Sequence, residues 1–72
     1  MKKLMFHSEY DENMKGDLVY YGDESKEIFS DYEQHKPQGI IIGGDNSSDY
    51  PFSVRNVNGN VQSWRYIAYD CN

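Results

Sequence analysis

The chain has 72 residues, the size of one domain, and a domain this small buries only about 60% of its unfolded surface. This excludes a two-domain enzyme. Twelve acidic and seven basic residues give a net charge of −5 and a sequence pI near 4.7, which argues against a protein that grips nucleic-acid phosphates. Aromatic residues make up 15% of the chain, so we expect a folded protein rather than a disordered acidic tail.

Three short strands are predicted in the first two thirds of the chain. Residues 4–7 and 18–21 are rich in β-forming side chains, and residues 11–16 form a polar loop between them. Residues 40–42 are three consecutive isoleucines with glycines on both sides. A continuous β-branched run is typical of a strand that is covered on both faces, so we expect this strand near the middle of a sheet.

One helix is predicted at residues 24–35, between the second and third strands. Asp23 is the expected N-cap, because its short carboxylate can accept from the first free backbone N–H groups. Ile28, Phe29 and Tyr32 share one helical face and should pack against the sheet.

A β-hairpin is predicted near the end of the chain. Residues 52–57 and 61–69 flank Asn58-Gly59-Asn60, which has the residue types of a hairpin turn. A two-residue loop would place apolar side chains opposite polar ones on both faces. A three-residue loop gathers apolar side chains on one face by pairing Val57 with Val61, Val54 with Trp64 and Phe52 with Tyr66. Burial favours this second register, with Trp64 in the core.

These elements predict one α+β domain over residues 1–72. Their order is ββαβββ, and the economical arrangement has two layers, a mostly antiparallel sheet with one short helix packed on it. A five-stranded barrel of the oligonucleotide-binding type is disfavoured, because its helix normally follows the third strand and its surface would be basic.

No motif points to catalysis, to a cofactor or to a metal. The loop after the isoleucine run lacks the Lys and Ser or Thr of a phosphate-binding loop. Residues 11–22 resemble an EF-hand loop only at their start, because Lys15 and Gly22 stand where calcium ligands belong. His7 and His35 lie far apart in the sequence, and Cys71 has no partner for a disulfide. A domain this small is also not expected to enclose a small-molecule pocket of roughly 300 Å³.

The uneven distribution of charge is the most informative feature. Residues 7–33 hold nine acidic residues against two lysines, a charge of −7, whereas the rest of the chain carries +2. Tyrosines are interleaved with these acids, and aromatic side chains are typical of protein interfaces. The plainer interpretation is that the acids keep a small domain soluble while the aromatic residues fill its core.

The chain therefore predicts a small acidic protein-binding module, a stoichiometric inhibitor or adaptor that docks on a basic surface of a larger protein, for example a surface that binds nucleic acid. In composition it resembles the accessory proteins that phages and mobile elements use against host or defence machinery, some by DNA mimicry. The alternative is a self-associating structural protein with no inhibitory role. The expected partner-binding residues are Asp17, Tyr20, Asp23, Glu24, Glu27, Asp31 and Glu33.

The sequence also predicts where such a protein acts. Only three apolar residues follow the N-terminal lysines, so no export signal is expected, and no apolar run is long enough to cross a membrane. We expect a cytoplasmic monomer or weak homodimer that contacts neither a membrane nor nucleic acid directly.

Overall fold

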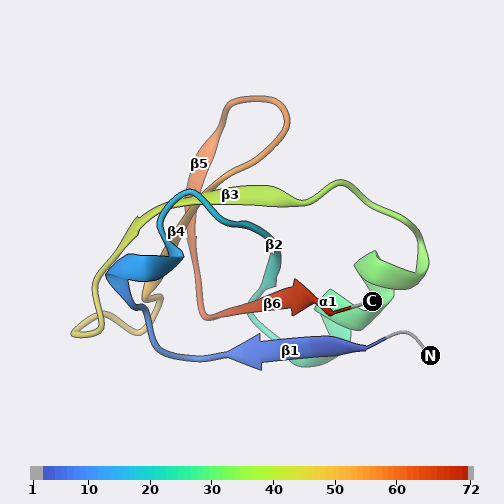
Figure 1. The fold of residues 1–72 in the computed structure, drawn as a ribbon, viewed down its shortest axis with the longest axis horizontal. Coiled ribbons are helices and arrows are strands. Elements are labelled where there is room, and N and C mark those ends of the chain that lie inside the picture. The colour runs from blue at the N-terminus through green and yellow to red at the C-terminus, as the bar shows by residue number, and fades with distance from the viewer. Residues whose placement is uncertain (1–2, 72) are drawn as a thin grey trace.

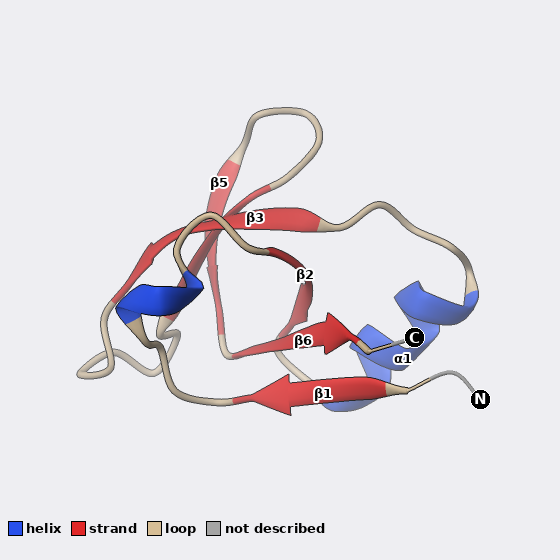
Figure 2. Cartoon of the chain, in the orientation of Figure 1, coloured by secondary structure: helices blue, strands red, loops and turns tan. Residues whose placement is uncertain are grey.

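A computed structural model describes residues 3–71, and over these residues the chain forms a six-stranded antiparallel sheet with one α-helix and one 3₁₀ turn (Figures 1 and 2). The elements are β1 Leu4–His7, η1 Glu12–Met14, β2 Leu18–Gly22, α1 Ser25–Glu33, β3 Gly39–Gly44, β4 Phe52–Arg55, β5 Val61–Trp64 and β6 Tyr66–Asp70. The predicted α+β class is confirmed. Within the described range, no helix is long and apolar enough to cross a bilayer.

The sheet has one more strand than the sequence predicts, because its last predicted strand is divided at Arg65. The strand order is β1-β6-β2-β3-β4-β5, so β6 lies between β1 and β2 while β5 lies at an edge beside β4. Ala68 of β6 faces Phe6 of β1 on one side and Tyr20 of β2 on the other. The predicted pairing of Phe52 with Tyr66 is therefore wrong.

Two hydrophobic cores lie on opposite faces of β2 and β6. Ile28 of α1 packs with Tyr20 and Ala68 on the helix side. The neighbouring side chains Val19 and Ile67 point to the other face, because successive residues of a strand alternate. There they meet a second cluster that includes Phe52 of β4. Since two strands separate β4 from β6, the sheet curls on itself, as the crossing ribbons of Figure 1 show.

The helix is shorter than expected and packs through fewer side chains. It ends at Glu33, and His35 takes a left-handed conformation with φ 55, which cannot continue an α-helix. Ile28 is fully buried, and Tyr32 is half-buried. Phe29, expected to pack on the sheet, is 47% exposed and contacts only the margin of the core, where its ring lies 5.1 Å from that of Phe6.

The isoleucine strand has a central position but is covered on one face only. β3 lies between β2 and β4, as predicted. Ile41 is fully buried, whereas Ile40 is 37% exposed because α1 covers the sheet only over β2 and β6. The expectation of cover on both faces is therefore wrong.

The hairpin of β4 and β5 has a five-residue loop rather than a three-residue one. Phe52 faces Trp64 and Val54 faces Gln62, a shift of two residues from the predicted register. The longer loop is stabilised by Asn56, whose side-chain oxygen accepts from the backbone N–H groups of Asn58 and Asn60 at 3.0 and 3.1 Å. A shift of two keeps the side chains of β4 and β5 on their predicted faces. Beyond the bend the prediction fails, because Ile67 joins Phe52 and Val54 while Ala68 lies in the other core.

Trp64, expected in the core, is half-buried and packs against it. Its ring lies 5.2 Å from that of Tyr21, with an interplanar angle of 42°. The residue therefore covers the margin of the core rather than filling its centre.

Close packing over β3 generates a test of the fold. A Cβ added at Gly39 would lie 2.6 Å from Cγ1 of Val54 and 2.9 Å from the Arg55 carbonyl oxygen, whereas a Cβ at Gly43 meets nothing within 4 Å. We expect Gly39→Ala to lower the free energy of unfolding by about 1–3 kcal/mol, because the backbone of β4 must move. Gly43→Ala, in the same strand, should change it by less than about 0.5 kcal/mol. Urea denaturation checks both, and equal stabilities would contradict this packing.

Candidate functional site

The start of α1 is held by a contact that the sequence does not predict. The N-cap residue is Glu24, which makes no side-chain capping bond. Asp23, the expected N-cap, instead accepts from the backbone N–H of Arg65 through Oδ1 at 3.2 Å. Arg65 lies at the bend between β5 and β6, where no strand partner receives its N–H. The Asp23 carboxylate gives the Arg65 N–H an acceptor in place of a strand partner. This hydrogen bond ties the start of the helix to the bend.

A surface hollow lies beside this contact. It has a volume of about 760 Å³ and opens widely to solvent, so it is a surface hollow and not an enclosed pocket. Segments far apart in the sequence form it: β1, the start of α1, the loop before β4, and the bend into β6. The lining residues are Phe6, Asp23, Glu24, Ser25, Glu27, Tyr50, Arg65 and Tyr66. Aromatic rings and carboxylates therefore share one concave surface.

Negative charge predominates in the hollow. Three of its lining residues are acidic and one, Arg65, is basic. Arg65 places its guanidinium carbon 5.4 Å from the centre of the Tyr50 ring and makes no ion pair with the described residues. Glu24 contacts Lys26 at 3.5 Å, but both side chains are mostly exposed, so this pair is weak. Glu27 is exposed and has no ion pair among the described residues.

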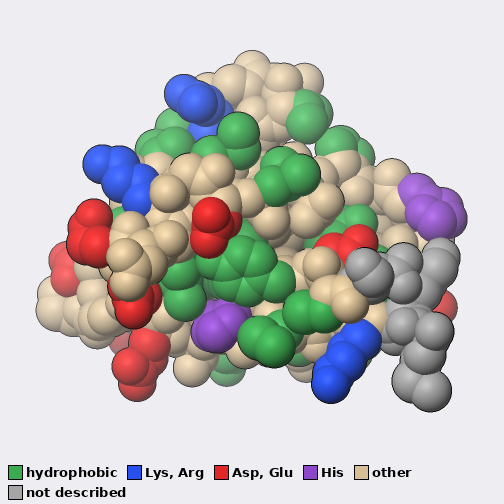
Figure 3. Space-filling model, in the orientation of Figure 1, with side chains coloured by type: hydrophobic (Ala, Val, Ile, Leu, Met, Phe, Trp, Pro, Cys, Tyr) green, Lys and Arg blue, Asp and Glu red, His purple; other side chains and the backbone are tan. Residues whose placement is uncertain are grey.

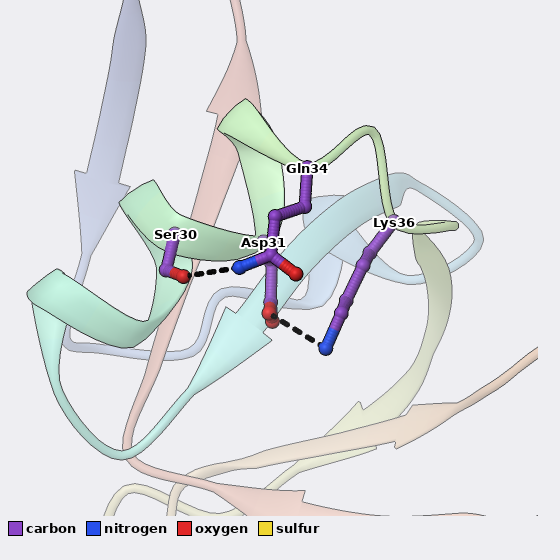
Figure 4. Close-up of polar contacts among 4 residues, drawn as sticks. All are labelled: Ser30, Asp31, Gln34 and Lys36. Carbon is purple, nitrogen blue, oxygen red and sulfur yellow. Dashed lines mark hydrogen bonds and ion pairs between the residues drawn. The ribbon is translucent and has the colours of Figure 1, made fainter.

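The other predicted acids of the helix lie outside the hollow. Glu33 is exposed in the last turn. Asp31 is half-buried, and its Oδ1 lies 3.8 Å from Nζ of Lys36, which follows the helix (Figure 4). Beside it, Gln34 donates to Oγ of Ser30 at 2.7 Å (Figure 4). Of the predicted partner-binding acids, Glu24, Glu27 and Glu33 are thus the most accessible.

Two predicted partner-binding residues hold the fold together instead. Tyr20 is only 9% exposed, and its ring meets Tyr32 edge-on at 5.5 Å, so it cannot be a surface anchor. Asp17 is half-buried, and its Oδ2 accepts from the hydroxyl of Tyr69 at 2.6 Å. Its carbonyl oxygen also accepts from the backbone N–H of Ile41 at 3.0 Å. Tyr20 lies in β2 and Asp17 directly before it, and both side chains are engaged by other parts of the fold.

The acidic stretch divides into two surface patches. Glu9, Asp11 and Glu12 are exposed around η1, which Figure 1 shows at the opposite side of the molecule from α1. Figure 3 shows acidic side chains gathered at that end of the visible face. Asp11 there accepts from the backbone N–H of Asn13 at 2.9 Å and so caps the turn. The acids of residues 7–33 are close together in the sequence, but in the fold they do not form one continuous acidic surface.

Sequence analysis missed the aromatic part of the hollow. Tyr50 is 44% exposed, and Phe6 and Tyr66 are half-buried. All three lie outside the acid-rich helix segment, and no local pattern distinguishes them from core aromatics. Within residues 3–71, no group of three or more His, Cys, Asp or Glu side chains is arranged to hold a metal ion.

Comparisons with protein families, with curated proteins and with solved structures found no match to this chain.

The contact between Asp17 and Tyr69 predicts a response to alkaline pH. Burial, and then the hydrogen bond to Asp17, raise the pKa of Tyr69 from 10.0 to about 12. Between these values the folded state keeps a proton that the unfolded state loses, so the free energy of unfolding falls as pH rises from 10 to 12. In thermal melts over this range, Tyr69→Phe should lose stability less steeply than the parent. Tyr66→Phe, which removes a hydroxyl that has no contact with Asp17, is the control. Parallel curves for the parent and Tyr69→Phe would contradict the assignment.

Proposed function

We propose that this protein is a small acidic binding module that docks on a basic surface of a larger protein, as a stoichiometric inhibitor or adaptor. The observation that carries the proposal is the hollow beside α1, where three acidic residues line a surface that also presents Tyr50 and Tyr66. At protein interfaces, binding is often dominated by aromatic side chains that are surrounded by charged and polar residues.

The charge of the chain favours a basic protein as the partner over a nucleic acid. A net charge of −5 repels phosphates, and the same field accelerates encounter with a positively charged surface. A protein surface that itself binds nucleic acid would offer this charge. The compositional resemblance to phage and mobile-element accessory proteins extends the proposal to inhibition of host or defence machinery, either by DNA mimicry or by ordinary docking.

The patch at α1 is a better docking surface than the patch at η1. Glu27 and Glu33 have no ion pairs among the described residues, so docking would not first have to break an internal contact. At η1, one of the three acids already caps the turn. A hollow also lets a partner side chain enter and lose water, which strengthens its electrostatic contacts.

Self-association is the second candidate function, and an exposed apolar row favours it. Leu18, Ile40, Arg55 and Val61 face one another in turn across β2, β3, β4 and β5. The three apolar members are exposed, and β5 is an edge strand that a second chain could extend. A dimer whose mass in sedimentation equilibrium does not change with salt would favour this function.

Reversing charge at the two acidic patches separates them. We expect Glu27→Lys/Glu33→Lys to reduce capture of basic proteins from a lysate of the native host by roughly tenfold or more, because attraction becomes repulsion. Glu9→Lys/Glu12→Lys makes the same change in net charge at η1 and should leave capture unchanged. Quantitative mass spectrometry of the bound proteins, with elution by increasing salt, measures both.

The circular dichroism of the two variants should match that of the parent, because these side chains are exposed. Equal capture by both variants, or loss only in the η1 variant, would contradict docking at α1.

A further inference from the structure

We infer that the hollow beside α1 receives an arginine side chain of the partner. The inference rests on the proposed function and names the chemical group that the hollow recognises. It requires a concave surface with free carboxylates, an aromatic wall, and a reason to prefer a guanidinium to an ammonium.

The carboxylates meet the first requirement. Glu24 and Glu27 both line the hollow; Glu24 is the N-cap of α1 and Glu27 lies in its first turn, so both carboxylates stand at the start of the helix. Among the described residues, Glu27 has no ion pair, and Glu24 pairs only with the exposed Lys26. Two carboxylates are therefore accessible to the fork of donors that a guanidinium carries.

The aromatic wall already holds a group of the expected chemistry. The guanidinium of this chain's own Arg65 lies over the ring of Tyr50, with its central carbon 5.4 Å from the ring centre. This distance is within the range of a favourable cation–π contact. Tyr66 and Phe6 add two half-buried rings to the same hollow. The hollow therefore already holds one guanidinium against aromatic carbon, with Arg65 on one face of the Tyr50 ring.

An arginine fits this combination better than a lysine. A planar guanidinium can stack on a tyrosine ring and still donate from its edge to carboxylates, whereas an ammonium is a compact, strongly hydrated charge. The positive charge of Arg65 opposes an incoming cation, but three acidic residues line the same hollow. The balance within the hollow therefore favours one further positive charge.

Short blocked peptides test the inference without the partner. Acetyl-Gly-Arg-Gly-amide, added to the ¹⁵N-labelled full chain, should shift the amide signals of Glu27, Tyr50 and Tyr66 saturably. Acetyl-Gly-Lys-Gly-amide should bind about two- to five-fold more weakly, the size of an exposed cation–π contact. Tyr50→Ala should weaken the arginine peptide by a similar factor, and Tyr50→Phe should restore it.

Glu33→Gln is the matched control, because it neutralises an exposed acid of the same helix that does not line the hollow. It should leave the shifts at the hollow unchanged. Absence of shifts there, equal affinity for the two peptides, or no effect of Tyr50→Ala would each overturn the inference.

Capture of the partner separates this inference from the proposed function. If Tyr50→Ala captures the partner like the parent while Glu27→Lys/Glu33→Lys does not, the acidic surface is correct and the arginine site is wrong. If Glu27→Lys/Glu33→Lys captures like the parent, the proposed function fails. Loss of capture in both Tyr50→Ala and Glu27→Lys/Glu33→Lys, with parental capture by Tyr50→Phe, supports both.

Discussion

The bend at Arg65 is the constraint on which the rest of the structure depends. It ends β5 at Trp64 and lets β6 turn away from β4 and enter between β1 and β2. β6 thereby has hydrogen-bonded partners on both sides, and its adjacent residues Ile67 and Ala68 are fully buried on opposite faces. A straight continuation of β5 would leave β1 without a partner. The two small cores of this domain are joined through that one strand and through β2.

The same bend assembles the hollow. It places Arg65 and Tyr66 beside the start of α1, where Asp23 accepts from the Arg65 N–H. Tyr50 precedes β4, and the Arg65 guanidinium lies over its ring. A residue that would be expected to cap the helix therefore joins the helix to the sheet. The acids at the start of α1 therefore line a concave surface instead of a flat one that is exposed to solvent.

Local patterns predict much of this fold. The strands at 4–7 and 18–21, a helix after them and the faces of the hairpin up to Trp64 follow from side-chain periodicity, and the structure confirms them. Beyond the bend the predicted faces are wrong, because Ile67 rather than Ala68 packs with Phe52 and Val54. The bend at Arg65 could not be predicted in this way, because residues 61–69 contain no Gly or Pro to mark a break in the strand. After the bend, β6 pairs with β1 and β2, which lie far away in the sequence, so the turn depends on tertiary contacts.

The candidate site, too, follows only in part from local sequence patterns. Exposed acids of the helix, such as Glu27, follow from helical spacing alone. The burial of Tyr20 does not, because Leu18-Val19-Tyr20-Tyr21 contains no residue that indicates which face will be covered. Tyr50 lies in a loop far from the acids in the sequence and joins them only through tertiary contacts. Sites formed from several loops lack a local signal for this reason.

Site-specific photo-crosslinking in the native host tests the central claim, that a basic partner is held at the acidic hollow, most directly. A benzophenone amino acid would replace Ser25, which is exposed and lines the hollow without carrying charge. Matched positions are Asn13 in η1 and Gln62 in β5, which are also exposed and uncharged. The account predicts that one basic protein is cross-linked from Ser25 and from neither of the other two. A cross-link to that protein from Asn13 or Gln62, with none from Ser25, would contradict it.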